Sequence, residues 1–322
     1  MRDGRRIPLA LIVLALSATS DSGAQQQSCT AGDCGVATAR VSSPGATTAS
    51  VLWQPSMNVF RRFDVAAERM YEFYGAVLGF KQLSTLNVGN GGGVARFQAG
   101  AQELKLTRRV ANRHYEPGGV QDATGLRLLT FYFADEAELT ARFAEHGLPA
   151  PAFSAVPRSN PPSASRSALV TDPDGQAVEL VIVPNATADQ LAAIEVGVTV
   201  ADLERSRAFY RSFVGLEELP PVRDERFGTT KYSFRHGATT VSLRSFGNAL
   251  PADNGSGGIQ YVVSDVEHVD ALARERHITI AQPLQGLRGF DLRTIWLDDP
   301  DGVTNYFAET GASRRARSTA SP

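Results

Sequence analysis

Cysteine is scarce in this 322-residue sequence: there are two, Cys29 and Cys34, and both lie near the N-terminus. A lone pair at this spacing is poor evidence for zinc, because a zinc site needs more nitrogen or sulfur ligands. In an oxidising compartment we expect the two to form a small disulfide loop, outside the folded core and of little consequence for its stability.

The chain also lacks an excess of positive charge and an apolar run of membrane length. Its formal net charge is -2, so no basic field points to a nucleic-acid partner. The N-terminal apolar run at Ile7–Leu16 is too short to span a bilayer, so we expect no stable membrane anchor.

That apolar run has the features of an export signal. Arg2, Arg5 and Arg6 precede it, and small residues follow it up to Ser22–Ala24, which resembles a cleavage site. We therefore expect residues 1–24 to be a cleaved signal peptide and the mature protein to be periplasmic or secreted. No cysteine stands at the cleavage point, so a lipoprotein is not expected.

Two motifs recur in the same order and at nearly the same spacing. The segment Arg69–Phe80 is matched by Arg205–Leu216, each with a Phe-Tyr pair. The Asp-Pro-Asp-Gly sequence that begins at Asp172 returns at Asp299, each time between two short apolar strands. Such a double recurrence indicates a duplicated domain.

Composition and motif positions together give the boundaries. Residues 25–56 are rich in small and polar residues without periodicity, and 311–322 are basic and then small and polar. We expect a signal peptide at 1–24, a linker with Cys29 and Cys34 at 25–56, a first domain at 57–185, a second domain at 192–310 and a disordered tail at 311–322.

Within each domain the pattern is a half-unit, used twice. A short apolar strand leads into an amphipathic helix, and two or three strands follow. Asp135, Asp202 and Asp265 stand where they cap predicted helices. Four half-units result.

These residues give the chain a recognisable likeness. Through Val77–Phe80, Val200–Leu203, Phe209-Tyr210 and both Asp-Pro-Asp-Gly turns it resembles the vicinal oxygen chelate (VOC) superfamily of glyoxalase, bleomycin-resistance and extradiol-dioxygenase proteins. The resemblance covers nearly all of 57–310. It implies an α+β fold of four βαβββ modules, paired into two half-open barrels, each around a cavity.

The resemblance also implies divalent metal chemistry, with Mn, Zn, Ni or Fe held by side chains of the first and last strands of the modules. Carried over by position, the ligands are Glu179 and Glu195. In the second domain, the position that corresponds to Glu179 is Tyr306. In the first domain, the position that corresponds to Glu195 is Val59. The equivalent first-strand positions of the other two modules are Leu128 and Gly258, and neither can bind a metal through its side chain. No domain alone holds a full ligand set.

Two pairings of the modules are open, within domains or across them. Pairing the second module with the third would bring Glu179 and Glu195 into one barrel, opposite Leu128 and Ser242. His114 and His236 are conceivable additional ligands.

Two functions follow, both with a small-molecule ligand or substrate. The first is an exported glyoxalase-like protein with a cavity and a degenerate or altered metal site, walled by aromatics such as Tyr232, Tyr261, Trp296 and Tyr306. The alternative is a metal-dependent lyase, isomerase or dioxygenase using Glu179 and Glu195, with Tyr306 or Lys105 polarising the substrate. Substrate, metal and oligomeric state stay open.

Overall fold

The computed structural model describes residues 45–87, 93–100, 102–155, 165–247, 249–287 and 289–320. These residues fall within a single compact unit that starts at Pro44. The expected signal peptide and the Cys29–Cys34 pair lie outside the described residues.

The four expected modules are present. The first contains β1 (Asn58–Phe63), α1 (Ala67–Tyr71) continuing as the π-helical η2 (Glu72–Val77), β2 (Lys81–Asn87), β3 (Gly93–Ala99) and β4 (Gln102–Arg108). The second contains β5 (Gly125–Phe133), α2 (Glu136–Glu145), β6 (Ser154–Ala155), β7 (Arg166–Thr171) and β8 (Ala177–Ile182). The third contains β9 (Ile194–Thr199), α4 (Leu203–Ala208) continuing as η3 (Phe209–Val214), β10 (Glu217–Glu218), β11 (Val222–Asp224), β12 (Thr229–His236) and β13 (Thr239–Arg244). The fourth contains β14 (Gly257–Val262), α5 (Val266–Glu275), β15 (Thr279–Gly286), β16 (Leu292–Asp298) and β17 (Thr304–Thr310). Outside the modules lie η1 (Thr48–Val51), α3 (Ala188–Leu191) and α6 (Gly311–Ala320).

The helices begin where the sequence predicts. The side chains of Asp135, Asp202 and Asp265 each accept a hydrogen bond from the backbone N–H three residues later, at 3.0–3.1 Å. Each bond satisfies a donor that the first helical turn leaves without a partner. The three predicted caps are therefore confirmed.

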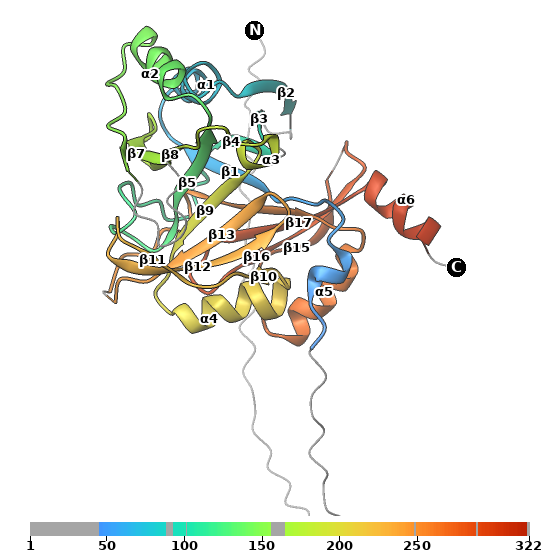
Figure 1. Ribbon diagram of the computed structural model, residues 1–322. Coiled ribbons are helices and arrows are strands. Elements are labelled where there is room, and N and C mark those ends of the chain that lie inside the picture. The colour runs from blue at the N-terminus through green and yellow to red at the C-terminus, as the bar shows by residue number, and fades with distance from the viewer. Residues whose placement is uncertain are drawn as a thin grey trace, which may run out of the picture. The chain divides into compact units, whose positions relative to one another are not determined.

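The sheets pair the modules across the two halves of the sequence. One sheet has eight strands in the order β15-β16-β17-β14-β1-β4-β3-β2, and the other has nine, with the path β10-β12-β13-β9-β5-β8-β7-β6 and β11 added on β12. The first module thus joins the fourth through β1 and β14, and the second joins the third through β5 and β9. Over the described residues, neither strand path closes on itself. Of the two pairings that the sequence left open, the structure has the one across domains (Figure 1).

The helices, unlike the sheets, group by sequence: helices from the same half of the chain lie together. Figure 1 shows α1 and α2 together at one end of the unit, and α4 and α5 together at the other. At the first end the rings of Phe73 and Phe143 meet edge to face, 6.3 Å between centroids. Each half of the sequence therefore builds one helical layer while sharing both sheets.

The two recurring motifs meet in space. The hydroxyl of Tyr74, from the first Phe-Tyr pair, donates to Asp172 Oδ2 at 2.9 Å. The hydroxyl of Tyr210, from the second pair, donates to Asp299 Oδ2 at 2.7 Å. All four groups are buried. The motifs recur together because each helix is fastened to a turn of the next module.

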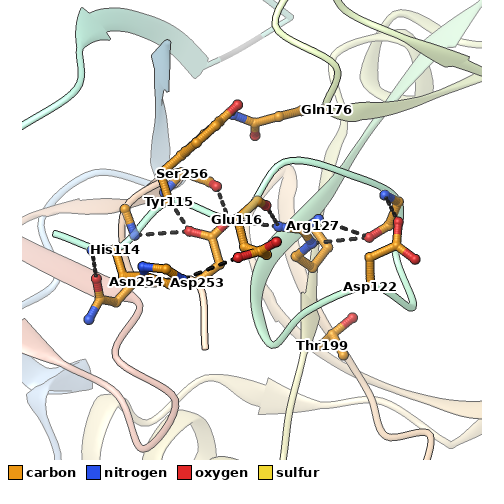
Figure 2. A network of polar contacts seen from close by, with 12 residues as sticks. His114, Tyr115, Glu116, Asp122, Arg127, Gln176, Thr199, Asp253, Asn254 and Ser256 are labelled. Carbon is orange, nitrogen blue, oxygen red and sulfur yellow. Dashed lines mark hydrogen bonds and ion pairs between the residues drawn. The ribbon is translucent and has the colours of Figure 1, made fainter. Parts of the chain in front are cut away.

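The loops that precede β5 and β14 fasten the two halves to each other. The backbone N–H of Thr124 donates to the carbonyl of Pro251 at 2.9 Å, and the N–H of Asp253 donates to the carbonyl of Thr124 at 3.1 Å. Arg127 and Asp253 also form a buried ion pair at 2.6 Å (Figure 2). Arg127 also donates to the carbonyl of Glu116 at 2.5 Å, so the pair holds both loops. These contacts position β5 and β14, the first strands of the second and fourth modules, which pair with β9 and β1 where the modules join.

Two boundaries differ from expectation. The tail is not disordered over Gly311–Ala320, which form α6. Arg314 binds Glu309 at 2.5 Å, and Ser313 and Thr310 bond to each other at the helix start, which stabilises the helix. The expected linker is also partly folded: Thr48 is buried and donates to the carbonyl of Val214 at 2.9 Å.

Candidate functional site

Glu179 and Glu195 come together on the nine-stranded sheet. Thr130 of β5 lies directly opposite Glu179 of β8 on one side and Glu195 of β9 on the other. Directly opposed residues in a sheet project from the same face. Thr130 Oγ1 also donates to Glu179 Oε2 at 3.2 Å. The two glutamates that the sequence singles out therefore flank one threonine on one face.

Glu195 is bound on both oxygens by cationic and hydroxyl side chains. Lys231 Nζ lies 3.1 and 2.9 Å from the two carboxylate oxygens, and Arg244 Nη2 lies 3.3 Å from Oε1. Ser242 Oγ donates to Oε1 at 2.5 Å. Burial by itself would raise the pKa of Glu195, but the charges of Lys231 and Arg244 outweigh it and lower that pKa to about 2. Glu195 is therefore an ionised carboxylate at neutral pH, paired on both oxygens.

Glu179 is held less tightly. Arg226 Nε is 3.6 Å from its Oε1. Burial raises the pKa of the Glu179 carboxyl, and the negative charge of Glu195 raises it further. The two carboxylates therefore differ in proton affinity although they face the same threonine.

The turn between β11 and β12, residues 225–228, reaches over to the neighbouring module. From this turn Arg226 donates to Ser167 Oγ at 2.5 Å, on β7. Phe227 accepts from Gln121 Nε2 at 3.3 Å through its carbonyl. The turn thus brings Arg226 to Glu179 across the module boundary.

The donors present do not fit a divalent ion. Within the part of the chain that the structure describes, no group of three or more His, Cys, Asp or Glu is placed to hold a metal. The two histidines do not complete the set: His114 is exposed and contacts Glu116, and His236 bonds to the carbonyl of Gln54 at 2.5 Å. A divalent ion at Glu195 would have to displace Lys231, at the expense of its ion pair.

Tyr306 and Lys105 lie on the other sheet. Tyr306 of β17 pairs with Gln260 of β14, and Lys105 Nζ contacts the side-chain oxygen of Gln260. Burial lowers the pKa of Lys105 and raises that of Tyr306 to about 12. Tyr306 and Lys105 both lie on strands of the eight-stranded sheet, so they do not share a sheet with Glu179 and Glu195.

Of the four aromatic residues expected to wall a cavity, two have other surroundings. Tyr261 is fully buried, stacked on Phe307 at 4.6 Å, and belongs to the core. Tyr232 lies against the guanidinium of Arg207, 4.8 Å from its ring centre. Only Trp296 and Tyr306 form a pair, edge to face at 5.3 Å, on the eight-stranded sheet.

Sequence reasoning missed the three cations of the site, Arg226, Lys231 and Arg244. Two of them carried a usable signal. Lys231 and Arg244 are charged residues within strands, where a buried charge requires a partner. Arg226 lies in a turn, where a charged residue is ordinary, so nothing in the pattern points to it.

Comparison with known proteins agrees with this architecture. A sequence profile of the Glyoxalase/Bleomycin resistance protein/Dioxygenase superfamily matches residues 57–180 and 190–307. The chain belongs to this superfamily. The family and fold implied by the sequence motifs are thereby confirmed.

Solved structures show the same fold. Glyoxalase I from Zea mays is 19% identical with a TM-score of 0.61, covering 81% of this chain and 94% of its own. A candidate dioxygenase from Bacillus subtilis strain 168 is 12% identical with a TM-score of 0.57, covering 83% and 87%. Identities this low establish the fold alone. No curated protein sequence matches the chain. None of the described helices is long and apolar enough to cross a membrane.

Proposed function

We propose that this chain is an exported glyoxalase-superfamily protein that binds a small molecule on its nine-stranded sheet without a metal ion. Its own cationic side chains take the place of the ion. The observation that carries the proposal is the position of Lys231, whose ammonium lies within 3.1 Å of both oxygens of Glu195. A carboxylate already paired in this way has little left to offer a divalent cation.

The surroundings of the pair support the same conclusion. Arg244 adds a second positive charge to Glu195, and Ser242 uses its hydroxyl on the same oxygen. Such a carboxylate is satisfied by hydrogen bonds and charge together, which is what allows it to stay ionised when buried. The degenerate site is thus a complete ion-pair cluster.

A metal-dependent lyase, isomerase or dioxygenase is the alternative. One observation favours it: Glu179 and Glu195 flank Thr130 on one face, as a pair of ligands would. For this function Lys231 and Arg244 would have to leave Glu195 when the ion binds, and at least one further donor would have to come from water or substrate. The resting arrangement opposes that change.

Calorimetric titration with manganese, zinc and nickel tests the proposal. Metal-stripped wild-type protein should give no saturable binding at the nine-stranded sheet. Any weak signal should be the same in the Glu195→Gln variant, because surface carboxylates produce it. Stoichiometric binding to the wild type that Glu195→Gln abolishes would overturn the proposal in favour of the metal enzyme.

A control removes a paired but more exposed carboxylate from the other sheet: the side chain of Glu103 is 26% exposed, against 9% for Glu195. Glu103→Gln, whose side chain pairs with Arg96 and Lys105, should behave like the wild type in every metal titration. If Glu103→Gln and Glu195→Gln lowered metal binding equally, the metal would be adventitious and the proposal would stand.

Export is supported by the charged start, the short apolar run Ile7–Leu16 and the small residues before Gln25. Mass spectrometry of protein from the cell envelope of the native host should give a mature N-terminus near Gln25. Full-length protein in the cytosol would contradict export and leave the binding proposal untouched.

A further inference from the structure

The three cations of the nine-stranded sheet differ in how completely their N–H groups have hydrogen-bond partners. Lys231 is committed to Glu195, and Arg226 contacts Ser167 and Glu179. Arg244 donates through Nε to Asp224 at 2.8 Å and through Nη2 to Glu195 at 3.3 Å. Among the residues that the structure describes, its third nitrogen, Nη1, has no hydrogen-bond partner.

This unpartnered nitrogen is buried. The side chain of Arg244 is only 2% exposed, so bulk water does not replace the missing partner. A buried N–H without an acceptor is costly, and most such groups in proteins are satisfied. An acceptor that arrives with a ligand would satisfy it.

Gly197 shows where this nitrogen lies. A Cβ added at Gly197 would stand 3.1 Å from Arg244 Nη1 and 2.7 Å from Leu128 Cβ. Gly197 is two residues along β9 from Glu195, so both positions face the same side of the sheet. Nη1 therefore lies over the face that carries the two glutamates, in room that only glycine leaves free.

Apolar side chains adjoin the guanidinium. Leu128 belongs to a small apolar cluster, separate from the main core, with Val120 and Ala177, against which Phe227 and Phe246 pack while partly exposed. The guanidinium carbon of Arg244 is 5.4 Å from the ring centre of Phe227. A cation with an unpartnered N–H thus stands beside a buried apolar cluster whose outer members, Phe227 and Phe246, are partly exposed.

We infer that Arg244 binds the anionic group of a small organic ligand whose apolar part packs against Leu128 and Phe227. The inference rests on the proposed function, because it places the ligand on the nine-stranded sheet. A planar guanidinium binds carboxylate and phosphonate oxygens in the same way, so the ligand class is a small amphipathic anion. Entry requires the turn at 225–228 to move, since Phe227 lies against Arg244.

Calorimetric titration with benzoate, phenylphosphonate and benzamide tests this inference. Benzoate and phenylphosphonate should bind the wild type saturably, and benzamide, which is neutral and nearly the same shape, should bind at least about tenfold more weakly. Arg244→Gln should weaken both anions by about tenfold or more. Equal binding of benzamide and benzoate, or benzoate binding unchanged by Arg244→Gln, would overturn the inference.

Two further variants keep the test decisive if Arg244→Gln does not fold, which circular dichroism would show. Phe227→Ala leaves the ion pairs intact and should weaken benzoate several-fold while leaving inorganic phosphate unchanged. Arg96→Gln removes a paired arginine of the eight-stranded sheet and should change neither anion. Benzoate binding that Phe227→Ala leaves unchanged, or that Arg96→Gln weakens, would contradict the site.

The two proposals fail in different experiments. Metal binding at Glu195 would overturn the metal-free function whatever benzoate does. Failure of the anion titrations, with the metal titrations silent as expected, would overturn only the ligand class.

Discussion

The two sheets have the same backbone arrangement but carry different chemistry at corresponding positions. The central row across the nine-stranded sheet reads Glu195, Thr130, Glu179, and the row across the eight-stranded sheet reads Asn58, Gln260, Tyr306. The position that corresponds to Glu195 is therefore Asn58 and not Val59, one residue away from the expectation. The first row is acidic and has recruited Lys231, Arg244 and Arg226 as counter-charges. The second row is neutral and polar, and within it Asn58 Nδ2 donates to Gln260 Oε1 at 3.5 Å. Duplication preserved the register while the charges diverged.

The difference teaches that a carboxylate retained from a metal-binding family does not by itself indicate a metal. A buried carboxylate needs positive charge, and lysine or arginine supplies it as a metal does. What decides is the set of neighbours: Lys231 and Arg244 reach Glu195 from other strands of its own module, and Arg226 reaches Glu179 from a turn of the third module. The following predictions test whether the two sheets differ in this way.

The largest expected effect is the difference in unfolding free energy between removing Glu195 from one sheet and Glu103 from the other. Glu195→Gln leaves Lys231 and Arg244 short of negative charge in a buried site and should destabilise the protein by about 3–5 kcal/mol. Glu103→Gln, at a more exposed pair, should cost less than about 1 kcal/mol. Urea unfolding of both variants measures the difference. Equal costs would show that the charged cluster is no more tightly coupled than an ordinary surface pair.

The two Asp-Pro-Asp-Gly turns differ in the same sense. Asp172 pairs with Arg61 at 3.1 Å, with both side chains fully buried, whereas no described cation pairs with Asp299. Asp172→Asn should therefore lower the free energy of unfolding by about 3–5 kcal/mol, because it leaves the buried charge of Arg61 without its partner. Asp299→Asn should cost about 1 kcal/mol or less, since the amide resembles the protonated acid. Urea unfolding at pH 7 decides, and a reversed order would contradict the account.

The second turn, with Asp299, predicts that stability depends on pH. Burial raises the pKa of Asp299 from 3.8 to about 7 in the folded protein. Its stabilising contribution is therefore complete below the unfolded pKa and lost as pH rises through about 7. The free energy of unfolding of wild type relative to Asp299→Asn should fall between pH 4 and pH 7, by at most about 1.4 kcal/mol per pH unit. A difference that stays flat over this window would exclude the raised pKa.

The smallest effect concerns the cysteines. Replacing Cys29 and Cys34 together by Ser should shift the melting temperature by less than about 2–4 °C, because the loop that they would close is short and precedes both halves of the fold. Differential scanning calorimetry of the oxidised wild type and the double variant measures it. A much larger drop would mean that the segment packs on the folded unit.

Most of the fold was predictable because its strongest patterns are local. The helix caps at Asp135, Asp202 and Asp265 and the two turns depend on a few adjacent residues. The edge strands β2 and β15 were not predicted, because half-exposed edge positions carry no apolar pattern. The helix α6 was missed because contacts with Glu309 and Asp265, not its own composition, stabilise it.

The site was only partly predictable. Glu179 and Glu195 followed from family position, and their meeting on one face depended on the module pairing, which no local pattern specifies. The same pairing separates Tyr306 and Lys105 from them. The neutralising role of Lys231 and Arg244 is a long-range property, since each reaches Glu195 from a different strand.

The measurement that tests the central claim most directly is a double-mutant cycle between Glu195 and Lys231, by urea unfolding with and without manganese. If Lys231 is the counter-charge of Glu195, the Glu195→Gln/Lys231→Met double variant should be less destabilised than the sum of the singles, by about 1–3 kcal/mol. Manganese should not change this coupling energy. Additive costs, or a coupling that appears or vanishes with manganese, would contradict the claim that this chain's own lysine takes the place of the ion.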